Sequence, residues 1–73
     1  MDRTLLKDHL AQAERHIATG ERTLDQQREL IRDLERDGHD ARSARALLES
    51  FEQLQTLHFA DRERILDELA AAG

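Results

Sequence analysis

Cysteine, proline, valine, tryptophan and tyrosine are all absent from this chain of 73 residues. Without cysteine there is no disulfide framework and no thiolate metal site. Without valine, and with only seven isoleucines and threonines together, β-strands are disfavoured. Without proline, only glycine is left to interrupt a helix. The sequence therefore predicts a chain of long helices.

Long apolar runs are also missing, so no segment is typical of a membrane-spanning helix or of a signal-peptide core. The 16 acidic residues outnumber the 11 basic ones, and the formal net charge is −5 at pH 7. Acids interleaved with arginines disfavour a nucleic-acid phosphate footprint. The polar faces contain a single lysine, Lys7, and disfavour a membrane surface. We expect a cytoplasmic protein that binds neither nucleic acid nor membrane.

The apolar residues that are present are few for a stable monomer. Twelve leucines, three isoleucines and two phenylalanines must offset the conformational entropy of the whole chain. The length allows one small domain, residues 1–73. We therefore expect the chain to associate with itself, as a homodimer.

Gly38 predicts the one break in the helical pattern. A glycine after a long periodic run usually ends a helix in the left-handed conformation, and Asp40 can cap the helix that follows. The sequence predicts a helix over about 3–37 that Asp2 caps, a turn over 38–40 and a second helix over about 41–71. Such a short connection makes the two helices antiparallel.

An apolar stripe runs along each predicted helix. On the first helix, spacings of four and three residues give a heptad seam of Leu6, Leu10, Ala13, Ile17, Gly20, Leu24, Gln27, Ile31 and Leu34. On the second helix, one face carries Ala44, Leu47, Leu48, Phe51, Leu54, His58, Ile65 and Leu69. The predicted fold class is all-α, an antiparallel two-helix hairpin with a coiled-coil-like seam.

A second stripe on the later helix consists of Leu48, Phe59 and Leu66, because offsets of eleven and seven residues return to nearly the same azimuth. Two stripes make a face wider than one helix covers, and we expect two hairpins to form a four-helix bundle. The stripe serves either the homodimer contact or the docking of another protein. Whether the hairpins pack parallel or antiparallel stays open, as does a swapped dimer in which Gly38 is helical.

Polar and small residues interrupt the middle of the seam: His16, Gly20, Gln27, His58 and Arg62. If the turn centres on Gly38, residues whose numbers sum to about 78 lie opposite each other. In that register Gly20 faces His58, and Gln27 faces Phe51. Buried polar residues fix register in coiled coils, so we interpret this set as a polar layer.

The alternative interpretation of the polar layer is a metal site. His16 and His58 could converge across the hairpin, with Glu21 or Asp61 as a carboxylate ligand that suits zinc. The Glu-x-x-His pairs of di-iron bundles are missing, because positions 13 and 55 are Ala and Gln. If these residues form a polar layer, we expect the protein to bind no cofactor.

Catalytic patterns are also missing. The two serines, Ser43 and Ser50, have no evident base, and the glycines form no phosphate-binding loop. The sequence predicts a small non-enzymatic protein, regulatory or adaptor in kind, that binds proteins through its helical faces. The alternative function is a metal-binding helical bundle.

Three segments carry a resemblance to known sequences: residues 16–22 (HIATGER), 27–31 (QRELI) and 34–40 (LERDGHD). With Leu47-Leu48, Leu57-His58 and Asp61-Arg62, they make most of the chain similar to a group of short uncharacterised helical proteins from α-proteobacteria. The resemblance implies a bacterial cytoplasmic helical protein. It implies no activity and no functional residues.

Overall fold

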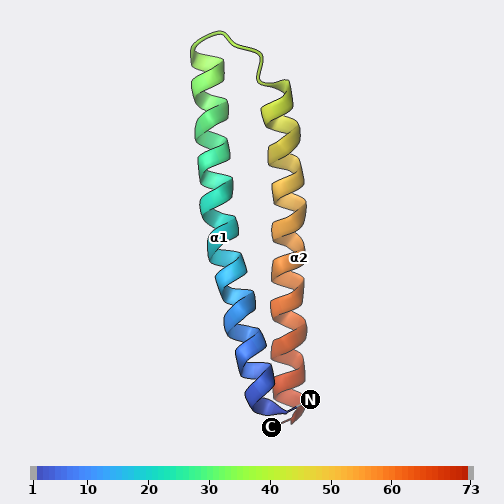
Figure 1. Cartoon of the computed structure of the whole chain (residues 1–73). Coiled ribbons are helices and arrows are strands. Elements are labelled where there is room, and N and C mark those ends of the chain that lie inside the picture. Colours follow the sequence, from blue (N-terminus) through green and yellow to red (C-terminus); the bar gives the residue numbers. More distant parts are fainter. Residues whose placement is uncertain (1, 73) are drawn as a thin grey trace.

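Two long helices lie side by side in opposite directions and form a hairpin (Figure 1). The computed structural model describes residues 2–72, in which α1 spans Arg3–Arg36 and α2 spans Arg42–Ala72. The hairpin measures 55 × 14 × 12 Å. The predicted all-α antiparallel hairpin is confirmed. The first helix ends one residue earlier than predicted, and the second helix begins one residue later.

Capping groups explain where each helix begins and ends. The Asp2 carboxylate accepts a hydrogen bond from the Thr4 amide at 3.0 Å, as expected of an N-cap. At the other end of α1, Gly38 adopts a φ of +75°, and the amides of Gly38 and His39 donate to the carbonyls of residues 35 and 34. This is the Schellman arrangement that the position of Gly38 predicts. The Asp40 carboxylate then accepts from the Arg42 amide at 3.0 Å.

The seam on α1 lies where the heptad pattern predicts. All nine predicted seam positions are buried or half-buried, from Leu6 to Leu34. The best-buried apolar contacts lie toward the termini, where Leu6, Ala13 and Ile65 form a cluster that Leu10 and Leu69 extend. The period of 3.5 residues was enough to assign this face because its apolar positions have no competing stripe.

The seam on α2 is only partly the predicted one. It begins at Ala41, directly before the helix, and continues at spacings of three and four residues through Ala44, Leu48, Phe51, Gln55, His58, Arg62, Ile65 and Leu69, all buried or half-buried. Leu47 and Leu54, which we placed on this face, are 46% and 50% exposed. The polar Gln55 and Arg62 occupy seam positions instead, while leucines lie beside the seam.

The register also differs from the prediction. Gly20 lies against Gln55 and not His58, and Gln27 donates to the carbonyl of Ala44 and does not face Phe51. Figure 1 shows the reason, because the connection runs back along the end of α1 before α2 begins. The start of α2 is thereby lowered by about one helical turn relative to α1.

Candidate functional site

Gln55 is the centre of the polar layer. Its side chain is only 4% exposed, and its Nε2 donates to the Ile17 carbonyl at 2.9 Å and to Glu21 Oε1 at 3.2 Å. Its Oε1 lies 2.9 Å from Nδ1 of His58. Gly20 makes room for this amide, because a β-carbon at Gly20 would lie 2.7 Å from the amide carbon of Gln55. Every polar atom of the buried amide therefore has a partner, which buried amides require.

His16 and His58 meet across the hairpin, as the metal hypothesis requires. Their ring centroids are 5.5 Å apart with an interplanar angle of 41°. No carboxylate joins them, since Glu21 accepts from Gln55 and Asp61 pairs with Arg64 at 2.6 Å. Among residues 2–72 there is no group of three or more histidine, aspartate or glutamate side chains placed to hold a metal ion.

Gln27 is a second buried amide, 8% exposed, one heptad nearer the loop than Gly20. Its Nε2 donates to the backbone carbonyl of Ala44 at 2.9 Å. Gln27 and Gln55 thus bond in opposite directions across the seam, one from each helix. A slide of either helix would break both bonds, so the two amides act together to fix the register.

Arg62 is the least satisfied member of the predicted polar layer. Its guanidinium carbon lies 5.3 Å from the centroid of the Phe59 ring, a cation–π geometry. Its Nε is buried and has no hydrogen-bond partner within the described part of the chain. The long side chain therefore contributes apolar cover to Phe59 more than hydrogen bonding.

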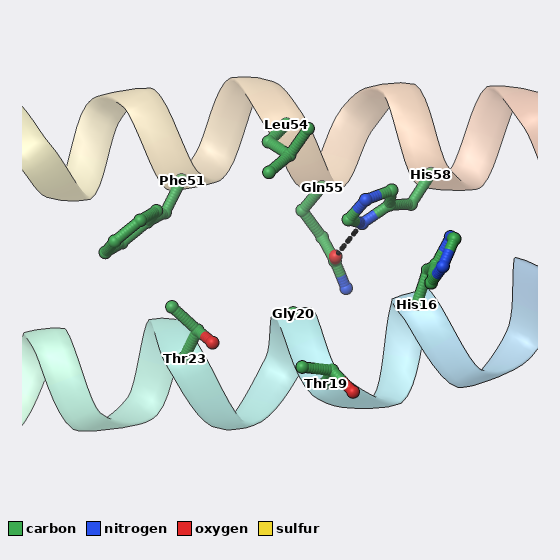
Figure 2. A pocket seen from close by; sticks show the side chains of 8 residues that line it. All are labelled: His16, Thr19, Gly20, Thr23, Phe51, Leu54, Gln55 and His58. Atoms are coloured by element: carbon green, nitrogen blue, oxygen red, sulfur yellow. Dashed lines mark hydrogen bonds between the residues drawn. The ribbon is translucent and has the colours of Figure 1, made fainter.

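A pocket of about 300 Å³ opens on one side of the seam beside Gln55 (Figure 2). Phe51 and Leu54 of α2 and Thr19 and Thr23 of α1 form its walls, which are mainly apolar. His16 and His58 face each other at one end of it, and Gly20 lies opposite the Gln55 amide. The pocket exists because glycine and threonine stand on α1 where larger residues would fill the space.

The three residues predicted as an interaction stripe do not share one face. Leu48 is half-buried at a seam position, whereas Phe59 and Leu66 are 37% and 40% exposed. Phe59 lies on the side of the seam away from the pocket, together with Glu21, Arg28 and Glu52. Leu48 therefore contributes to the contact with α1 and leaves Phe59 and Leu66 as outward-facing residues.

Sequence reasoning missed Gln55, the best-buried polar residue of the site. The signal for it was the spacing itself, because Phe51, Gln55, His58 and Arg62 continue one pattern of four and three residues. Leu54 is the more hydrophobic residue, but placing it on the seam instead of Gln55 departs from that pattern. The pocket was missed for the same reason, because Gln55 is one of the residues that line it.

Comparison with models of protein families, with curated proteins and with solved structures finds no match to this chain. Within residues 2–72, neither helix has a stretch apolar and long enough to cross a membrane.

Proposed function

We propose that this protein is a non-enzymatic interaction module, a regulatory or adaptor protein that works as a self-associated hairpin. The observation that carries the proposal is the exposed apolar surface. Seven large hydrophobic residues are 37% to 65% exposed: Leu5, Leu30, Leu47, Leu54, Leu57, Phe59 and Leu66. Large apolar surface left exposed in this way is typical of a protein that binds another protein surface.

The surface area of the hairpin supports the same proposal. The isolated chain exposes 5295 Å². A compact monomer of 8.4 kDa exposes about 4,600 Å². The excess, roughly 700 Å², is close to the ~800 Å² that each partner buries in an interface of standard size. A second copy packed on the hairpin would bring the exposed area per chain to the usual range.

The chemistry of the described residues supports a non-enzymatic role. The imidazoles of His16 and His58 contact each other, and the described hydrogen-bond partner of His58 is the amide of Gln55, not a hydroxyl nucleophile. The hydroxyl of Ser50 donates within its own helix, to the carbonyl of Ala46 at 3.4 Å. These contacts resemble the packing of a structural layer more than a nucleophile and its base.

Native mass spectrometry of the untagged protein tests self-association and bound adducts together. We expect a bare dimer of twice 8.4 kDa that dissociates on dilution, with a melting temperature that rises with protein concentration. A monomer at every concentration, with a melting temperature independent of concentration, contradicts the proposal.

Phe59 and Leu66 are the residues we propose for docking a second protein. Phe59→Ala should leave helicity largely intact, because Phe59 is already 37% exposed and lies outside the buried cluster. Circular dichroism at 222 nm measures this directly. If Phe59→Ala melts the hairpin, the residue belongs to the intrachain core and is not a docking residue.

The second candidate function is metal binding, which the 5.5 Å approach of the His16 and His58 rings favours. Two imidazoles supply half of a tetrahedral zinc shell, and water or a second copy would have to supply the rest. Zinc should then raise the melting temperature, and a chelator should reverse the rise. If His58→Ala abolishes the rise and His39→Ala does not, the polar layer is the site. No change with zinc or chelator eliminates this candidate.

A further inference from the structure

We propose that the pocket beside Gln55 binds a small neutral aromatic molecule that carries one N–H or O–H group. Nε2 of His58 accepts the hydrogen bond from this group. The site goes beyond the proposed interaction function. It does not depend on self-association either, because one hairpin supplies all the walls of the pocket.

The orientation of the Gln55 amide is the first step of the argument. Its Nε2 lies 2.9 Å from the carbonyl oxygen of Ile17, a group that can only accept a hydrogen bond. The same nitrogen lies 3.2 Å from Oε1 of Glu21, a second acceptor. Turning the amide around would place its oxygen against both acceptors. The side-chain oxygen of Gln55 therefore faces His58.

This orientation decides which nitrogen of His58 carries the proton. Nδ1 of His58 lies 2.9 Å from Oε1 of Gln55, and an amide oxygen can only accept, so Nδ1 is the donor. In a neutral imidazole the other ring nitrogen then has a free lone pair. Gln55 thus fixes Nε2 of His58 as a hydrogen-bond acceptor.

Nε2 of His58 is accessible from the pocket. Among residues 2–72, the hydrogen bond of this ring is made by Nδ1 and not by Nε2. The buried side-chain nitrogen that lacks a partner in the same part of the chain is Nε of Arg62, so Nε2 of His58 is in contact with solvent. The half-buried ring lines the pocket. A donor that enters the pocket can therefore replace water at Nε2.

Aromatic rings stand at both ends of the pocket. Figure 2 shows the ring of Phe51 at one end and the imidazoles of His16 and His58 at the other, with Leu54 between them. Phe51 and His58 are seven residues apart, so their backbone positions differ by about 10 Å along α2. A mainly apolar space of about 300 Å³ between rings suits a flat molecule of two fused rings.

The lack of charge around the pocket makes the ligand a neutral one. Within the described part of the chain, no lysine, arginine, aspartate or glutamate lines the pocket. A bound carboxylate would have no ion-pair partner there, and the net charge of −5 would repel it. A bound ammonium group would have no carboxylate. Because burying an unpaired charge is unfavourable, the ligand donates its hydrogen bond from a neutral group.

Two isomers, 3-methylindole and N-methylindole, test the site because they differ only in the N–H donor. The chain has no tryptophan or tyrosine, so the anisotropy of indole fluorescence reports the ligand alone, with a chelator present to keep metal ions from Nε2. At about pH 8, where free histidine is neutral, 3-methylindole should bind with a Kd on the order of 0.1–1 mM. N-methylindole should bind roughly 10-fold more weakly, because it leaves the acceptor unpaired. Equal affinities refute the hydrogen bond, and no binding of either isomer at several millimolar refutes the site.

Matched threonine substitutions test the position of the ligand. Thr23 is half-buried in the wall of the pocket, and Thr23→Leu should weaken binding of 3-methylindole roughly 10-fold or more, because leucine fills the space. Thr56 lies on the shallow surface beside Phe59, and Thr56→Leu should change the Kd less than about 2-fold. Circular dichroism checks that both variants stay helical. If Thr23→Leu has no effect, or both have the same effect, the ligand binds elsewhere and the proposal fails.

His58→Phe tests the acceptor, because phenylalanine keeps a ring and has no nitrogen. The preference for 3-methylindole over N-methylindole should then fall from roughly 10-fold to none. Comparing two ligands in the same variant cancels any change in the shape of the pocket. A preference that persists in His58→Phe refutes the role of His58. Nitrogen-15 NMR of the unliganded protein should show the proton on Nδ1 of His58, and a proton on Nε2 overturns the assignment.

Discussion

Gly20→Ala tests the assignment of Gln55 to the centre of the seam. In an isolated helix this change stabilises by about 1 kcal/mol, because alanine is the better helix former. In the hairpin, the new β-carbon would overlap the Gln55 amide, whose carbon would lie 2.7 Å away. That amide must move away, and its contacts with Ile17, Glu21 and His58 are then lost.

The magnitude follows from these two opposing effects. A buried amide left without hydrogen-bond partners costs about 1–3 kcal/mol. Set against the gain of about 1 kcal/mol in helix propensity, Gly20→Ala should lower the free energy of unfolding by up to about 2 kcal/mol. In a Gln55→Ala background the overlap is absent, and Gly20→Ala should stabilise by about 1 kcal/mol.

A double-mutant cycle measures this coupling directly. The four proteins are unfolded in urea at one protein concentration, and helicity is followed at 222 nm. We expect a coupling energy of about 1–3 kcal/mol between Gly20 and Gln55, because the propensity term cancels in the cycle and the cost of the unpaired amide remains. Gly38→Ala serves as a control, since a β-carbon there meets nothing within 4 Å and should show no coupling to Gln55. If Gly20→Ala has the same effect with and without Gln55, the two residues do not pack together and the reasoning is wrong.

Two further predictions concern the connection between the helices. Gly38→Ala should lower the free energy of unfolding in urea by about 1 kcal/mol, because an L residue is strained at φ +75°. Gly38→Asn should lower it less, because asparagine tolerates this conformation better. Equal losses in the two variants would contradict the conformational explanation. Hydrogen bonds from Arg42 lower the pKa of Asp40 below its ordinary value of 3.8. The contact between Asp40 and Arg42 therefore contributes fully to stability at pH values above 3.8. Its contribution is lost as the pH falls through the lowered pKa of Asp40 in the folded protein. Asp40→Asn should remove this part of the acid sensitivity in pH-dependent melting, and an unchanged pH profile would refute it.

Local features of the sequence determined the elements of this fold. The helices, the caps at Asp2 and Asp40 and the break at Gly38 depend on residues within a few positions of one another, so the chain specifies them without tertiary contacts. The α1 seam was equally predictable, because its apolar positions fit a single heptad phase.

Only the tertiary structure decided the phase of α2 and the register between the helices. Leucines lie beside the α2 seam as well as on it, so hydrophobicity alone is compatible with two rotations of α2 about its axis. The hydrogen bonds of Gln55 to residues of α1 decide between the two. The path of the connection then sets the axial offset by about one turn, which brings Gly20 to Gln55 instead of His58. Both depend on groups far apart in the chain, and no local pattern records how far one helix slides along another.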